Sequence, residues 1–184
     1  MKSFTEVDAP FVGAGSFAIV ERAALEEQFD GLLAKNGAAL SRLAASYTNT
    51  ASDRDDLLQE IAMAVWQALR SFRAECSPRT FLFRIAHNRA IAYLARNRPR
   101  LAGEEVDVHD PAPDPETGLA REQRAAQLRR AIHRLPLVYR QVITLTLEDL
   151  GYAEIAEVLG ISESNVGVRL SRARQLLRES LESK

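Results

Sequence analysis

The chain has 184 residues and a formal net charge of −1, with 46% hydrophobic and 27% charged residues. This composition is typical of a soluble globular protein and excludes disorder along the whole chain, and no apolar run reaches the roughly 18 residues that a membrane span requires. The single cysteine, Cys76, excludes an internal disulfide and is typical of a reducing compartment, so we expect a cytoplasmic protein without membrane insertion.

Charge is distributed along the chain in four blocks of alternating sign. Residues 1–60 carry five basic and ten acidic side chains, whereas residues 61–100 carry eight arginines and one glutamate. Residues 101–120 carry six acids and no base, and residues 121–184 carry eleven basic and eight acidic side chains. The block 61–100 is the natural candidate for contact with nucleic-acid phosphates, because each neutralised phosphate releases counterions.

The first half is predicted to be a disordered terminus over residues 1–20, followed by a helical domain over residues 21–98. Asp53 is expected to cap a helix that begins at Arg54, with further acids in its first turn. One face of this helix is apolar and carries Leu58, Ile61, Val65 and Leu69. Another face is mostly polar and carries Asp56, Gln59, Glu60, Met63 and Gln67.

A further helix is predicted over residues 78–97. Ser77 supplies a capping hydroxyl, Pro78 suits the first helical position, and Pro99 is expected to end the helix. One arc of this helix is apolar and holds Leu82, Phe83, Ala86, Ala90, Tyr93 and Leu94. The other arcs mix polar, basic and apolar side chains, namely Arg84, His87, Asn88 and Ile91 on one and Phe81, Ile85, Arg89, Ala92 and Arg96 on the other.

Residues 99–118 contain four prolines, two glycines and six acids, a composition that predicts a flexible acidic linker. Helical periodicity resumes near Leu119 and continues to the end, and no alternating strand pattern is present. The predicted fold is therefore all-α, with two small helical domains over residues 21–98 and 119–184 joined by the linker.

The second domain contains the pattern of a helix-turn-helix over residues 151–174. Ala156 is a small residue at the point where the two helices must cross closely. Gly160 suits a left-handed turn after the first helix. Ser162 is expected to cap the second helix, and Ile161 to fill the corner beneath it. The buried face of the second helix is expected to hold Val166, Leu170, Ala173 and Leu177. The side chains left outside are polar, basic or small, as groove reading requires, and include Ser164, Asn165, Gly167, Val168, Arg169, Ser171, Arg172, Arg174 and Gln175.

Four motifs in this order resemble the bacterial RNA polymerase sigma factors of the extracytoplasmic-function kind, which contain two helical domains called region 2 and region 4. Residues 53–66 resemble the part of region 2 that binds the clamp helices of the polymerase β′ subunit. Residues 72–94 resemble the part that melts and reads the minus-ten element. Residues 135–143 resemble the part of region 4 near the β flap, and the helix-turn-helix resembles the reader of the minus-thirty-five element.

The resemblance implies three sets of site residues. The residues implied to bind core polymerase are Asp53, Asp55, Asp56, Gln59, Glu60 and Met63. The residues implied to bind and melt the minus-ten element are Arg73, Arg79, Phe81, Arg84, His87, Asn88 and Arg96. The residues implied to bind the minus-thirty-five element are Ser164, Asn165, Val168, Arg169, Ser171, Arg172 and Arg174. The family often has a basic residue followed by Ser where this chain has Gly167 and Val168, and a Trp where it has Phe81.

The partners implied are core RNA polymerase (β′ clamp helices and β flap), promoter DNA and an anti-sigma factor. No catalytic residue, cofactor or metal site is expected, because the three histidines lie far apart and no nucleophile–base pairing is visible. The predicted function is that of an alternative sigma factor, not an enzyme. Two other interpretations are a dimeric helix-turn-helix regulator on a palindromic operator, and a sigma-like decoy that binds an anti-sigma protein.

Overall fold

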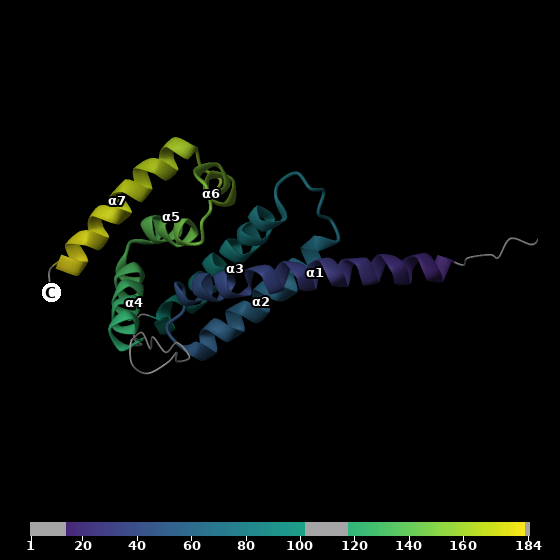
Figure 1. Ribbon diagram of the computed structural model, residues 1–184, viewed down its shortest axis with the longest axis horizontal. Helices are drawn as coiled ribbons and strands as arrows, with labels where there is room; N and C mark the ends of the chain where they lie inside the picture. The colour runs from purple at the N-terminus through teal and green to yellow at the C-terminus, as the bar shows by residue number, and fades with distance from the viewer. Residues whose placement is uncertain (1–13, 102–117, 183–184) are drawn as a thin grey trace, which may run out of the picture.

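The computed structural model describes residues 14–101 and 118–182, and every regular element in these ranges is an α-helix (Figure 1). The helices are α1 (Ala14–Ala45), α2 (Ala51–Leu69), α3 (Pro78–Leu101), α4 (Gly118–Arg134), α5 (Leu137–Leu147), α6 (Tyr152–Leu159) and α7 (Glu163–Glu182). The predicted all-α fold is confirmed. Since α1 begins at Ala14, the predicted disorder over 1–20 is wrong for its last residues, and residues 1–13 lie outside the described ranges.

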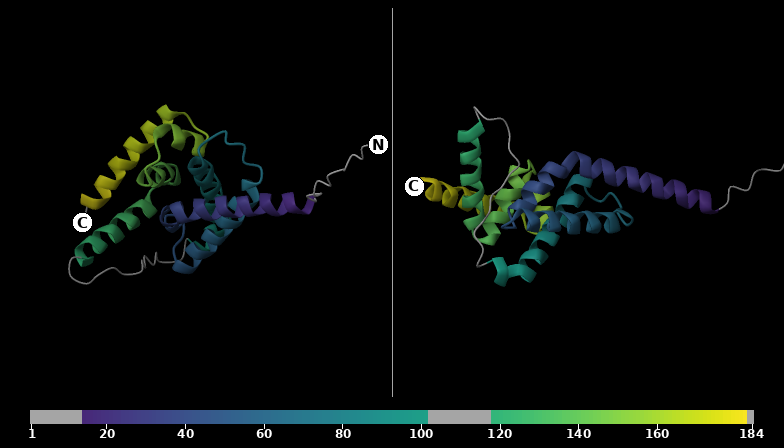
Figure 2. Two further views of the ribbon diagram at one scale, coloured as in Figure 1. Left: turned by 45° about the vertical axis from the view of Figure 1, so that its right-hand side comes forward. Right: turned by 90° about the horizontal axis from the view of Figure 1, so that it is seen from below.

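Helices α1, α2 and α3 pack together as the first half of the molecule, and the N-terminal part of α1 extends away from the body (Figures 1 and 2). Helix α2 begins at Ala51 because Thr50 caps it, its hydroxyl accepting a hydrogen bond from the Asp53 backbone N–H at 3.1 Å. The prediction that Asp53 caps a helix from Arg54 is wrong. Thr50 is itself a good capping residue and lies three residues earlier, so the helix gains nearly one more turn.

The buried face of α2 differs from the predicted one in one respect. Ile61, Val65 and Leu69 are buried as expected, but Leu57 is fully buried while Leu58 is only partly buried against the core. Helix α3 begins as predicted, since the Thr80 N–H donates to the Ser77 hydroxyl at 2.9 Å.

Helix α3 continues through Pro99 to Leu101, so its predicted end at residue 97 is wrong. A proline this close to the end of a helix removes a single backbone hydrogen bond, and few residues follow it. The predicted linker over 99–118 is correspondingly shorter, and residues 102–117 lie outside the described ranges.

Helices α4 to α7 form the second half, and α6 and α7 make the predicted helix-turn-helix. Gly160 ends α6 with a φ of 65°, the left-handed conformation that glycine adopts without strain. Ser162 accepts a hydrogen bond from the Asn165 N–H at 3.2 Å and so caps α7. Ala156 is buried at the crossing, and the inner face of α7 is confirmed, with Val166, Leu170, Ala173 and Leu177 all buried.

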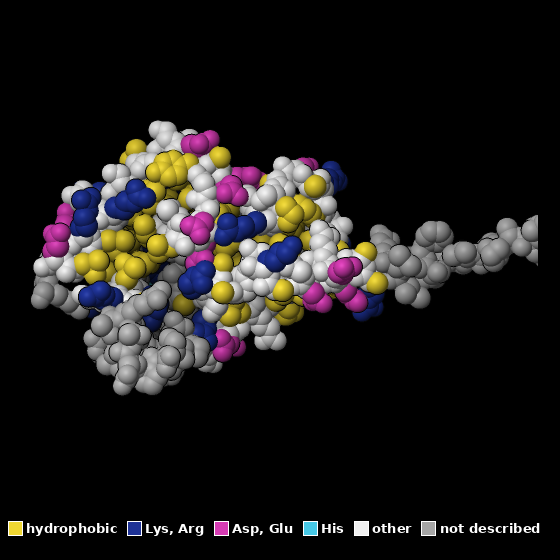
Figure 3. All heavy atoms as spheres, viewed as in Figure 1, with side chains coloured by type: hydrophobic (Ala, Val, Ile, Leu, Met, Phe, Trp, Pro, Cys, Tyr) yellow, Lys and Arg dark blue, Asp and Glu magenta, His cyan; other side chains and the backbone are white. Residues whose placement is uncertain are grey.

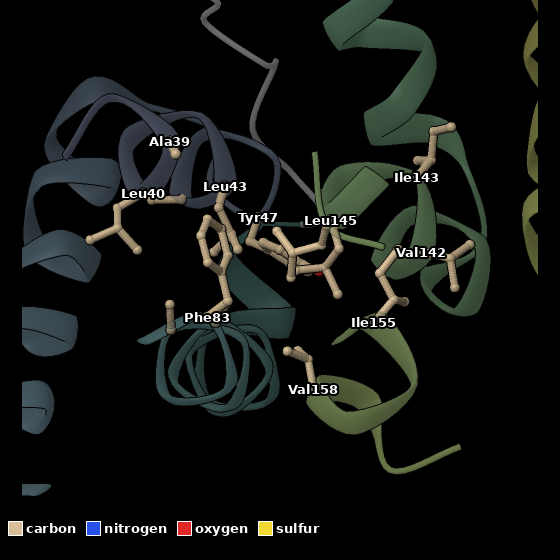
Figure 4. Packing of buried hydrophobic residues seen from close by; sticks show 14 of the residues in the cluster. Ala39, Leu40, Leu43, Tyr47, Phe83, Val142, Ile143, Leu145, Ile155 and Val158 are labelled. Carbon is tan, nitrogen blue, oxygen red and sulfur yellow. The ribbon is translucent and has the colours of Figure 1, made fainter. Parts of the chain in front are cut away.

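The two halves share one continuous hydrophobic core. Tyr47, which follows α1, is fully buried and lies between Phe83 of α3 and Leu145 of α5 (Figure 4). Ile155 and Val158 of α6 approach the same place from the second half (Figure 4). The sequence predicted two domains, but their packing against each other was not predicted. None of the described helices is long and apolar enough to span a membrane.

Candidate nucleic-acid interface

The outer face of α7 is open to solvent. Ser164, Asn165, Ser171, Arg172 and Arg174 are exposed, as predicted for a helix that enters a DNA groove. Val168 is 68% exposed in the middle of this face. The face therefore presents polar, basic and apolar groups, the mixture that can contact base edges and the thymine methyl group.

Two arginines on this face are held by neighbouring side chains. The Arg169 guanidinium donates to the Asn165 side-chain oxygen at 2.7 Å, and the Arg172 guanidinium donates to Gln175 at 2.8 Å. Gly167 precedes both arginines and faces Tyr152, whose ring carbon would be 3.6 Å from an added Cβ. That is an ordinary contact distance, so the glycine is not required by close packing.

A hollow of about 250 Å³ lies where α2 ends and α3 begins. Its walls combine two aromatic rings, two arginines and the connecting loop, and are formed by Ser71, Phe72, Arg73, Glu75, Cys76, Phe81 and Arg84. The rings of Phe72 and Phe81 contact each other at an interplanar angle of 39°, with centroids 4.5 Å apart. Ala74 shapes the loop with a φ of 56°, a left-handed conformation that a non-glycine residue rarely adopts. The hollow joins an aromatic surface to cations, which is what binding an unpaired base and its phosphate requires.

The predicted minus-ten residues do not share one surface in the structure. Arg73 and Asn88 are exposed, whereas Phe81 is 8% exposed and serves as a wall of the hollow. His87 is only 5% exposed and its Nε2 lies 3.3 Å from the side-chain nitrogen of Gln141 on α5. The prediction that His87 contacts DNA is therefore not supported in this arrangement, and burial lowers the pKa of its imidazole to about 4.

Arg79 and Arg84 contact the second half of the molecule. Arg79 donates a hydrogen bond to the backbone carbonyl of Glu148, and its guanidinium carbon lies 5.4 Å from the centre of the Phe83 ring. Arg84 pairs with Glu157 of α6 at 3.4 Å. The Cys76 thiol lies beside the same carboxylate, and partial burial, followed by its hydrogen bond to Glu157, raises the pKa of the thiol.

The exposed face of α2 forms a third candidate surface. Asp56, Gln59 and Met63 are exposed as predicted, and Met63 is 58% exposed. Together with α3 this face surrounds a shallow groove of about 500 Å³, lined by Asp56, Gln59, Glu60, Met63, Tyr93, Arg96 and Asn97. Acidic and amide groups beside an exposed methionine suit a basic helix with an apolar stripe.

Two assignments on this side of the molecule change. Asp53 is 1% exposed, so it lies on the buried side of α2 and not on the exposed face for which core polymerase binding was predicted. Arg96 donates to both carboxylate oxygens of Glu60 at 2.7 Å, so it belongs to the α2 groove and not to the hollow beside Phe81. Asp55 is exposed, paired with Arg54 at 3.1 Å, and stays a candidate.

The structure adds residues that the sequence did not single out. Cys76 lines the hollow, while Thr80 of α3 donates to Glu154 of α6 at 3.1 Å. The position of Cys76 in the basic block offered one weak signal. The contact between Thr80 and Glu154 had none, because the two residues are 74 positions apart.

Comparison with known sequences and structures identifies the family. The chain matches Sigma-70 region 2 over residues 32–100 and Sigma-70, region 4 over residues 125–177. It is 33% identical over 175 residues to the RNA polymerase sigma factor NccH of Alcaligenes xylosoxydans xylosoxydans, covering 90% of this chain and 94% of that protein. It is 31% identical over 150 residues to the ECF RNA polymerase sigma factor SigM of Mycobacterium tuberculosis, covering 81% and 74%. The chain is a sigma factor of the extracytoplasmic-function kind.

This sigma factor also resembles a solved structure of its family. CnrH, an RNA polymerase sigma factor of Cupriavidus metallidurans, has been solved in complex with the cytosolic domain of CnrY. It superposes with a TM-score of 0.66 and 28% identity, covering 86% of this chain and 90% of that chain. Membership of the family establishes that the protein is an alternative sigma factor directing promoter-specific transcription, and sigma factors are not generally enzymes.

Proposed function

We propose that this sigma factor uses three separate surfaces in initiation. The exposed face of α2 binds the clamp helices of core RNA polymerase, and the hollow beside Phe72 and Phe81 receives a base of the melted minus-ten strand. The outer face of α7 reads the minus-thirty-five element. Because polymerase and chromosome meet in the cytoplasm, the protein acts there.

The hollow is the observation that carries this proposal. A duplex opens only if an unstacked base finds a surface that replaces its lost stacking and cations that hold the backbone. Phe72 and Phe81 supply the aromatic surface, and Arg73 and Arg84 supply the charges at its rim. Base–aromatic stacking of about 1–3 kcal/mol per base is comparable with the cost of unstacking one.

The second half offers an apolar surface for a protein partner. Leu137, Val138 and Leu147 of α5 are exposed, and hydrophobic side chains gather over α5 and α7 (Figure 3). A hollow of about 220 Å³ lies beside Leu147 and is lined by Arg42, Ser46, Ile132, Thr144, Leu147 and Glu148. This surface suits the β flap of the polymerase. Since CnrH was solved with the cytosolic domain of another protein, we also propose an anti-sigma partner that covers the polymerase-binding faces.

Run-off transcription with purified bacterial core polymerase and a genomic fragment library tests the proposal. Addition of the protein should produce discrete new start sites that are absent without it. DNA binding without polymerase and without new transcripts would instead indicate the dimeric regulator, and protection of two half-sites one helical turn apart would confirm that reading. A protein that binds neither polymerase nor DNA would contradict the proposal.

A further inference from the structure

A groove of about 640 Å³ lies where the end of α2 crosses the extended part of α1 (Figure 1). The walls of this α1–α2 groove are formed by Arg22, Ala24, Leu25 and Gln28 of α1 and by Trp66, Leu69 and Arg70 at the end of α2. Its volume lies within the range of about 300–1,000 Å³ that is typical of small-molecule sites, so it can hold at least one nucleotide. None of the three surfaces proposed for initiation includes it.

The α1–α2 groove combines an aromatic ring with two cations. Trp66, the only tryptophan of the chain, is partly exposed and packs edge-on against Phe29 with ring centroids 5.2 Å apart. Arg22 and Arg70 are exposed, and the described residues that line the groove include no acid. An aromatic ring beside positive charge is the combination that binds single-stranded nucleic acid, because bases stack on the ring while phosphates pair with the cations.

Both arginines remain able to bind phosphate. Arg70 pairs with no carboxylate in the part of the chain that the structure describes. Arg22 donates through Nε to the Glu26 carboxylate at 2.9 Å, and both side chains of this pair are exposed. An exposed ion pair within one helix contributes little to stability, and the guanidinium keeps its other N–H donors for a second partner.

One turn of the chain connects the α1–α2 groove to the hollow beside Phe72 and Phe81. Leu69 lines the groove, whereas Ser71 and Phe72 line the hollow. The Phe72 N–H donates to the Leu69 carbonyl at 3.2 Å, so the two walls are held together by a backbone hydrogen bond. A DNA strand that leaves the hollow on this side therefore reaches Arg70 and then Trp66 with its next nucleotides.

We propose that the α1–α2 groove binds the nucleotides that follow the minus-ten element on the melted strand, with an unpaired base against Trp66 and phosphates on Arg22 and Arg70. The proposal rests on the proposed role of the hollow in receiving a minus-ten base. Continuity with the hollow and opposite charge favour this occupant, whereas an acidic protein segment would need only the charge. The groove then holds the strand on the side of the start site, where the duplex must stay open for transcription to begin.

Probes with two lengths of unpaired strand test the proposal on the holoenzyme formed with purified core polymerase. Both probes carry a promoter found by run-off transcription. The unpaired strand of the short probe ends with the minus-ten element, and that of the long probe continues for about five further nucleotides. The variant is R22A/R70A, which leaves the hollow intact. The matched control is R124A/R130A, which removes two exposed arginines of α4.

R22A/R70A should bind the long probe about tenfold more weakly than wild type at about 50 mM salt, and the short probe within about twofold of wild type. Each lost phosphate contact lowers the salt dependence of single-strand binding by about 0.7 in the logarithmic slope. The loss on the long probe should therefore be about sevenfold smaller at about 200 mM salt. The control should bind both probes within about twofold of wild type. Equal losses on the two probes, or no loss on the long one, would overturn the proposal.

Abasic nucleotides test the contact with Trp66 independently. In the wild-type holoenzyme, removal of the base at one position of the added strand should weaken binding about fivefold or more, because that base loses its stacking partner. W66F should keep this dependence. W66L, which retains an apolar side chain against Phe29, should abolish it. A dependence that persists in W66L would show that Trp66 only supports α1 and would contradict the proposed contact.

These outcomes are distinct from a failure of the proposed function. If the α1–α2 groove does not bind DNA, the short probe still binds and polymerase-dependent start sites remain. If the proposed function itself is wrong, neither probe binds specifically and no start sites appear with wild type. Loss on the long probe alone, with start sites retained in the wild type, is the result that the proposal predicts.

Discussion

Protonation of His87 should weaken the folded state as the pH falls. The imidazole is 5% exposed, its ring lies 6.3 Å from that of Tyr47 in an edge-on arrangement, and Gln141 contacts its Nε2. Burial lowers its pKa from the ordinary 6.5 to about 4, so the neutral ring is favoured in the folded state. The stability from the neutral ring is complete above a pH of about 6.5 and is lost as the pH falls through about 4.

The loss follows from the two pKa values. At a pH of about 5 the ring is mostly protonated in the unfolded chain and mostly neutral in the folded one. Between a pH of about 7.5 and a pH of about 5, the free energy of unfolding therefore falls by about 2 kcal/mol.

The assay is urea unfolding of wild type and H87Q at the two pH values. Glutamine keeps a polar contact for Gln141 but does not titrate. The variant should lose about 2 kcal/mol less stability than wild type between the two conditions. Other groups, His133 among them, contribute equally to both proteins and cancel in the difference. An identical pH dependence in the two proteins would refute the assignment of this sensitivity to His87.

Three substitutions elsewhere have expected outcomes of known sign. D56A/Q59A should weaken binding to core polymerase at least about tenfold, with E182A at the exposed end of α7 as a control, and unchanged affinity would contradict the α2 interface. G167A should stabilise the protein by up to about 1 kcal/mol in urea unfolding, because its Cβ would meet the Tyr152 ring at an ordinary 3.6 Å, and a destabilised variant would contradict that reading. A74G should stabilise by up to about 1 kcal/mol, since residue 74 has a φ of 56°, and a loss of stability would show that the alanine side chain is needed in the loop.

Local signals in the sequence predicted the parts of the structure that depend on neighbouring residues. The turn at Gly160, the cap at Ser162 and the buried face of α7 follow from conformational preference and helical spacing within about twenty residues. Local signals failed where two of them competed. Thr50 and Asp53 are both good caps, and no local rule decides between them. Pro99 lies close enough to the end of α3 for the helix to tolerate it.

The rest of the site depends on residues that are distant in sequence. Arg42 and Glu148 are 106 positions apart, so their pairing has no signature in periodicity or composition. The sequence predicts that His87 is an outward-facing polar residue of α3, because no neighbouring residue indicates that Gln141, 54 positions away, covers it. Helical periodicity predicts which face of a single helix is apolar and which is polar. It does not predict which polar face the other half of the molecule covers, because that depends on tertiary packing.

Permanganate probing of unpaired thymines tests the assignment of promoter melting to α3 most directly. It uses a promoter found by run-off transcription, with core polymerase and either wild type or R84A/N88A. The variant should bind polymerase as wild type does, yet leave most minus-ten thymines unreactive, because the cation and amide that hold the melted strand are gone. Equal thymine reactivity with both proteins would show that strand opening does not depend on this face of α3.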